Sequence, residues 1–166
     1  MIPELHRPLP LRHVPPEGLT FEVTATKAEC SALAIRLGLP AVAALTCRFH
    51  LLPQAGGGVA ADATLDAEVT QVSVVSLDPF PVRLHERFQL RFVPAGTEQN
   101  DDDPEAVDEI LFTGATIDPG EAAAEQLALV LDPYPRKPGE TLTPPADEHF
   151  ARGSPFAVLR GSGTKS

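Results

Sequence analysis

Five polar side chains alternate along one segment of this chain and could bind the backbone of a nucleic acid. They are Arg83, His85, Arg87, Gln89 and Arg91. Alternate residues of a β-strand project from one face about 6.5–7 Å apart, which is similar to the phosphate spacing of a single strand. Arginine binds phosphate oxygens, and histidine and glutamine can add hydrogen bonds. The same side chains could instead form ion pairs with carboxylates of a neighbouring strand, so both interpretations stay open.

A second candidate site consists of Tyr134, Arg136 and Lys137, in a segment interrupted by prolines. Proline restricts the backbone, so these side chains are presented to RNA or to a protein surface at a low entropy cost. In the alternative interpretation, Tyr134 and the prolines fix the end of a helix on a sheet.

No residue pattern in the sequence predicts catalysis. Carboxylates at Asp101–Asp103, Glu105 and Asp108 could hold Mg²⁺ in a nuclease, but consecutive carboxylates on a loop rarely converge on one ion. The sequence contains no nucleophile elbow and no phosphate-binding loop, and its five histidines lack ligand spacing. We therefore expect no enzymatic activity, no cofactor and no small-molecule substrate.

The basic row is expected to lie on one strand of an antiparallel hairpin. Apolar and polar residues alternate in Val59–Leu77 and again in Val82–Val93, with a turn at Pro79–Phe80. A tight turn there places Glu68 opposite Arg91. The two polar faces then lie on the same side, as a half-buried hairpin requires.

Local capping signals predict two helices. Thr26 and Glu29 form a capping box for a helix over about Lys27–Leu37. Asp118 is a good N-cap for a second helix over about Pro119–Leu131, which a proline-rich segment ends.

These elements predict an α+β fold, with a largely antiparallel β-sheet that is strongly curved or barrel-like, and two α-helices. We expect one domain over residues 1–138, with an acidic loop at 95–108, followed by a flexible C-terminal tail at 139–166. No apolar run has membrane-spanning length or resembles a signal peptide, which favours the cytoplasm. Cys30 and Cys47 are expected to be buried thiols.

The net charge of −10 limits how this chain could contact RNA. Phosphate binding is driven by Lys and Arg, so an RNA contact must come from a local basic patch. An acidic surface suits a basic partner instead.

Four segments, in this order, resemble the YceD-like family of large-subunit ribosomal RNA accumulation proteins. They are Ala25–Pro40, Thr70–Phe92, Ile117–Gly139 and Ser154–Leu159. The resemblance implies a non-enzymatic bacterial factor in ribosome biogenesis, with a large-subunit ribosomal RNA precursor, a basic ribosomal protein or both as partners, and no membrane. An acidic adaptor or holdase that contacts protein alone is the alternative, and a metal-dependent processing enzyme is a weaker one.

Some members of this family carry a Cys-x-x-Cys just before the Pro-Phe of the hairpin, a pattern that would suit zinc. Ser73 and Ser76 occupy those positions here. Hydroxyl groups are poor zinc ligands, so we expect no metal site in this chain.

Overall fold

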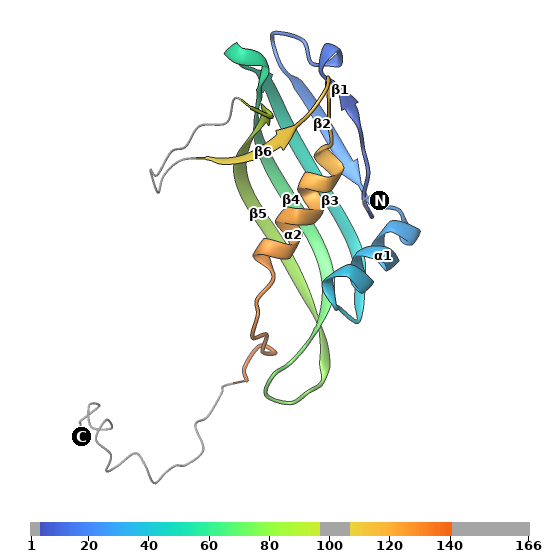
Figure 1. Ribbon diagram of the computed structural model, residues 1–166. Helices are drawn as coiled ribbons and strands as arrows, with labels where there is room; N and C mark the ends of the chain where they lie inside the picture. The colour runs from blue at the N-terminus through green and yellow to red at the C-terminus, as the bar shows by residue number, and fades with distance from the viewer. Residues whose placement is uncertain (1–3, 97–106, 141–166) are drawn as a thin grey trace, which may run out of the picture.

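The structure is a computed structural model that describes residues 4–96 and 107–140 (Figure 1). It has two α-helices, one five-stranded sheet and one two-stranded sheet, which confirms the predicted α+β class. The strands are β1 (Leu9–Pro10), β2 (Leu19–Thr24), β3 (Ala41–Pro53), β4 (Val59–Val72), β5 (Pro79–Pro94), β6 (Asp108–Phe112) and β7 (Thr116–Ile117), and the helices are α1 (Lys27–Leu37) and α2 (Pro119–Val130). Most of the predicted acidic loop, at 97–106, and most of the predicted tail, at 141–166, lie outside the described residues.

The large sheet is open and twisted. Its strand order is β2-β3-β4-β5-β6, and every neighbouring pair is antiparallel except β5 and β6, which are parallel. β2 and β6 are its two edges, so the described residues do not form the closed barrel that strong curvature could have produced. β1 pairs with β7, which joins the N-terminal segment to the strand that leads into α2.

Both helices begin at the predicted caps. The side chain of Thr26 accepts a hydrogen bond from the Glu29 amide, and the Glu29 carboxylate accepts one from the Thr26 amide. Gly38 then ends α1 in the left-handed conformation, with φ of 69°, which favours glycine. Asp118 caps α2 through the amide of Glu121. The predicted bounds of α1 are correct, and α2 ends one residue earlier than predicted.

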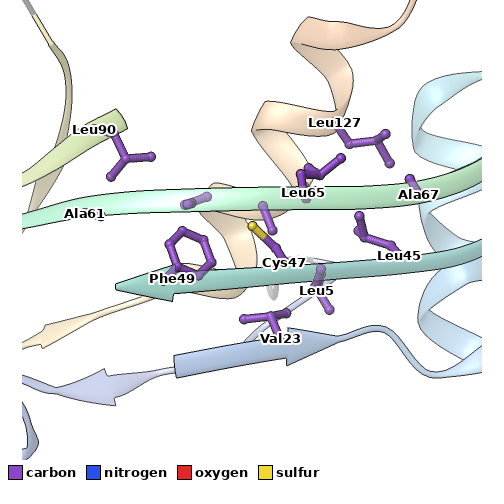
Figure 2. Close-up of a cluster of buried hydrophobic side chains, with 14 of the residues drawn as sticks. Leu5, Val23, Leu45, Cys47, Phe49, Ala61, Leu65, Ala67, Leu90 and Leu127 are labelled. Atoms are coloured by element: carbon purple, nitrogen blue, oxygen red, sulfur yellow. The ribbon is translucent and has the colours of Figure 1, made fainter. Parts of the chain in front are cut away.

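The core lies between one face of the sheet and the two helices, with the N-terminal segment beside it. Figure 2 shows Leu127 of α2 directed toward apolar side chains of the central strands. Phe49 is fully buried, and its ring packs edge-on against Phe88 with 6.1 Å between centroids. Cys30 and Cys47 are buried free thiols, as predicted. Burial raises the pKa of Cys47 to about 12, which keeps it protonated and unreactive.

The N-terminal segment is held against both helices. Leu5 is fully buried, and the guanidinium of Arg7 forms two hydrogen bonds of 2.7 Å to the Glu29 carboxylate. The Arg7 amide also donates to Asp118 at 2.8 Å. A Cβ at Gly120 would lie only 2.8 Å from the Leu5 carbonyl oxygen, so this close approach requires glycine.

The predicted register of the β4–β5 hairpin is wrong, although the predicted faces are correct. Glu68 lies opposite Arg83 and not opposite Arg91, because residues 73–78 form a longer loop and Pro79 already belongs to β5. The shift moves every pairing by an even number of residues. Side chains alternate with a period of two along a strand, so each residue stays on its predicted face.

Candidate functional site

The basic row lies on the face of β5 that points away from the core, as the alternation predicts. Arg83, His85, Arg87 and Gln89 are exposed or nearly so, while Arg91 is partly buried near β6. The buried side chains of β4 and β5 all point to the opposite side of the sheet. We call the side that carries the basic row the outer face of the five-stranded sheet.

Four members of the row have a partner on a neighbouring strand. Nε of Arg83 lies 2.7 Å from the Glu68 carboxylate, and Nδ1 of His85 lies 2.5 Å from Asp66. The side-chain amide of Gln89 donates to Asp62 at 2.7 Å, and Nη2 of Arg91 lies 2.5 Å from Glu109 of β6. The register explains all four contacts, because each pair of residues lies directly opposite across two strands.

Arg87 differs from the other members. It lies opposite Thr64 of β4, and it has no hydrogen-bond or ion-pair partner among the residues that the structure describes. The cross-strand ion pairs that the sequence left as an alternative are therefore present for Arg83 and Arg91, and within the described residues Arg87 forms none. Whether the row binds RNA or a protein stays a prediction.

The fold adds two residues that the sequence analysis did not connect with the row. Arg48 and His50 of β3 are exposed on the outer face, two strands away from β5. Together with Arg87 and Gln89 they line a shallow hollow of about 560 Å³ whose other walls come from β2 and β4. Alternation within β3 already directed Arg48 and His50 away from the core, but only the strand order shows that β3 lies next to β4 on this face.

The second predicted site, in the segment after α2, is anchored to the hairpin loop. The Val74 amide donates to the Pro135 carbonyl at 2.9 Å, and Nζ of Lys137 lies 3.2 Å from the Asp78 carboxylate. Tyr134 remains 71% exposed, so its ring does not clamp the helix to the sheet. Arg136 is also exposed.

The structure brings this segment next to one end of the basic row. Arg83 and Arg136 both border a groove of about 330 Å³, whose apolar lining includes Phe80, Val82 and Pro135. The two predicted sites are therefore neighbours, although they are far apart in the sequence.

Ser73 and Ser76 lie in the loop between β4 and β5 and play different structural roles. Ser73 is fully buried, its hydroxyl donates to the Glu140 carboxylate at 2.5 Å, and it accepts from the amides of Val75 and Ser76. The hydrogen bond from Ser73 is the main cause that lowers the pKa of Glu140. Ser76 is exposed and accepts one long bond, of 3.4 Å, from the Asp78 amide.

Charge on the outer face is nearly balanced. Four arginines (Arg48, Arg83, Arg87 and Arg91) face five carboxylates (Glu22, Asp62, Asp66, Glu68 and Glu109) within the described strands. The face as a whole is therefore no general anion-binding surface, and an anion would bind where an arginine lacks a carboxylate. In the described part of the chain, no three histidine, cysteine, aspartate or glutamate side chains converge as metal ligands. Over the same residues, neither helix is long and apolar enough to cross a membrane.

Comparison with known proteins identifies one family. No curated protein and no solved structure matches the chain. The family model described as "Large ribosomal RNA subunit accumulation protein YceD" matches residues 61–159, a segment that runs from β4 through the basic row and α2 into the C-terminal residues. This segment is more than half of the 166 residues, and the chain therefore belongs to the YceD family.

Proposed function

We propose that this protein supports the accumulation of large-subunit ribosomal RNA by binding to an assembling large subunit, without catalysing a reaction. The family match carries this proposal, because the matched residues 61–159 include every residue of the basic row and of the segment after α2. The contacts of those two regions define the surfaces with which the protein would bind.

The charge distribution suggests a bridging role. The chain carries 23 acidic and 13 basic residues, so its overall charge attracts basic proteins, of which ribosomal proteins are a large class. The outer face offers arginine side chains in an arrangement suited to an RNA precursor. A protein with both surfaces could hold a basic ribosomal protein beside the RNA, in the cytoplasm where subunits assemble.

One specific observation favours a second candidate, an acidic adaptor that binds a basic protein and no RNA. Arg48, Arg83 and Arg91 each lie within an ion pair with a carboxylate of a neighbouring strand. In this candidate the arginines stabilise the sheet and leave the excess of carboxylates to attract the partner.

The experiment that tests the proposal removes the gene and measures the ratio of large-subunit to small-subunit ribosomal RNA. We expect the ratio to fall and the wild-type gene to restore it. A gene lacking residues 99–106, which spares β6, should restore the ratio equally well, because the proposal gives the acidic carboxylates no catalytic role. An unchanged ratio in the deletion strain would contradict the proposed function, and failure of the shortened gene alone would show that these carboxylates are needed, for processing or for binding the basic partner.

A further inference from the structure

We propose that Arg48 and Arg87 form a clamp for one backbone phosphate of single-stranded RNA, above Thr64 on the outer face. This inference rests on the proposed function and makes it specific: it assigns the RNA contact to two residues on different strands, and it excludes most of the row along β5.

The position of the clamp follows from the register of three strands. Arg48 pairs with Thr64, and Thr64 pairs with Arg87, so the three residues form one line across β3, β4 and β5. Neighbouring strands are about 4.8 Å apart, which places the two arginine backbones about 10 Å from each other. Two long side chains can converge across this distance on a phosphate above the small threonine, whose hydroxyl can donate a further hydrogen bond. All three residues line the hollow of about 560 Å³.

The two arginines of this line are better placed to bind a phosphate than the other arginines of the outer face. Arg87 has no partner among the described residues, whereas Arg83 pairs with Glu68 and does not line the hollow. Arg48 lies 3.0 Å from Glu22, and both side chains are about half exposed or more, at 67% and 48%. An exposed pair of this kind contributes only about 0.2–1 kcal/mol, so a phosphate can replace Glu22 as the partner of Arg48 at little cost.

The adjacent line of residues suits a ribose rather than a second phosphate. It consists of Thr20, His50, Asp62 and Gln89, again in register across four strands. The Asp62 carboxylate would repel a phosphate, but it can accept a hydrogen bond from a ribose 2′-hydroxyl. His50 has no partner in the described residues and can contact the same sugar. The two lines are two residues apart along each strand, about 6.5–7 Å, a distance that a phosphate and its neighbouring ribose can span.

The test measures binding of a fluorescently labelled single-stranded RNA of mixed sequence to the full-length protein by anisotropy, between about 50 and 200 mM salt. The variants are Arg48→Gln, Arg87→Gln and the matched control Arg83→Gln. Each variant changes the net charge by the same amount, and Arg83 lies on the same strand and face as Arg87. All three side chains lie on the outer face, away from the core, so the fold should be retained, and circular dichroism verifies this.

We expect Arg48→Gln and Arg87→Gln each to weaken RNA binding about tenfold at low salt, because each removes a charge-assisted hydrogen bond to phosphate. Each should also make the dependence of log affinity on log salt less steep, by about 0.7 for each phosphate that is no longer neutralised. Arg83→Gln should stay within about twofold of wild type, because Arg83 does not line the hollow in which the phosphate would bind. DNA of the same sequence should bind more weakly than RNA, because it lacks the 2′-hydroxyl.

Two results would overturn the clamp. Equal weakening in all three variants would mean that general charge, and not this pair of arginines, governs binding. Wild-type affinity in Arg48→Gln and Arg87→Gln would mean that RNA binds elsewhere on the protein. If wild-type protein fails to bind RNA but deletion of the gene still lowers large-subunit ribosomal RNA, the clamp is wrong and the proposed function stands through a protein partner.

Discussion

Replacing Ser73 with alanine should destabilise the protein, whereas the same change at Ser76 should have little effect. The two serines occupy the positions at which some family members carry a Cys-x-x-Cys. Only Ser73 is buried, and its hydroxyl accepts hydrogen bonds of 3.0 and 3.2 Å from the amides of Val75 and Ser76. These bonds fix the loop between β4 and β5 internally, and the hydrogen bond from Ser73 to Glu140 joins it to the segment that follows α2.

The magnitude follows from the two amide bonds that alanine removes. Each contributes about 1 kcal/mol to stability, so Ser73→Ala should lower the free energy of unfolding by about 2 kcal/mol. In a chain of this size, 1 kcal/mol corresponds to about 2–4 °C in Tm, which gives an expected decrease of about 4–8 °C. Ser73 also donates to Glu140, so the variant should move the pKa of that carboxyl upward toward its ordinary value.

Thermal unfolding followed by circular dichroism at neutral pH measures the change, with Ser76→Ala as the matched control. The control should lower Tm by less than about 2 °C, because the Ser76 side chain is exposed and an exposed side chain contributes little. An NMR titration of the Glu140 carboxyl measures the second effect. Equal Tm values for wild type and Ser73→Ala, or equal losses in the two variants, would refute the argument that the buried hydroxyl fixes this loop.

Three further predictions concern the core and the N-terminal segment. Leu127→Ala should lower the free energy of unfolding, measured with urea, by about 2–5 kcal/mol, because Leu127 is fully buried. Leu129→Ala, at a position 71% exposed, should lower it by less than about 0.5 kcal/mol. Similar losses at both positions would contradict the placement of α2. Gly120→Ala should lower Tm, since its Cβ would lie 2.8 Å from a carbonyl oxygen of the N-terminal segment, and an unchanged Tm would show that this segment is not packed there. The ion pair with Arg7 lowers the pKa of Glu29 from 4.5 to about 2. Arg7→Ala should therefore lower the free energy of unfolding by about 1–2 kcal/mol, as expected for this partly exposed pair. The loss should be full above pH 4.5 and should shrink as the pH falls toward 2. Urea unfolding of wild type and Arg7→Ala across that pH range measures the loss. A difference in unfolding free energy that does not depend on pH would exclude the ion pair as its source.

Elements encoded by adjacent residues could be predicted from the sequence. The bounds of α1 follow from a capping box at one end and Gly38 at the other, and both signals act within a few residues of the helix. The faces of β4 and β5 follow from alternation, which depends on no distant part of the chain.

The register of the hairpin could not be predicted in this way. The loop at 73–78 is held by the buried hydroxyl of Ser73, by Glu140 and by the Pro135 carbonyl, all of which require contacts with the segment after α2. Leu77 adopts a positive φ of 63°, which a leucine rarely does and no local pattern announces. Interactions between segments that are distant in the sequence therefore decide which carboxylate faces which arginine.

The candidate site shows the same limit. Sequence alternation identified the row on β5, but the availability of Arg87 depends on the register, which places Thr64 and no carboxylate opposite it. Arg48 and His50 join the site only because β3 lies beside β4 in the sheet. Strand order and register are tertiary properties, so the sequence predicted that the row on β5 faces away from the core but not which residues of β3 and β4 lie beside it.

The measurement that tests the central claim most directly is sedimentation of cell lysate through a sucrose gradient, at low and at high salt, with this protein followed in each fraction. Association through charged surfaces predicts that the protein migrates with large-subunit precursors at low salt and returns to the top of the gradient at high salt. A protein that stays at the top of the gradient under both conditions would contradict a direct role on the assembling large subunit.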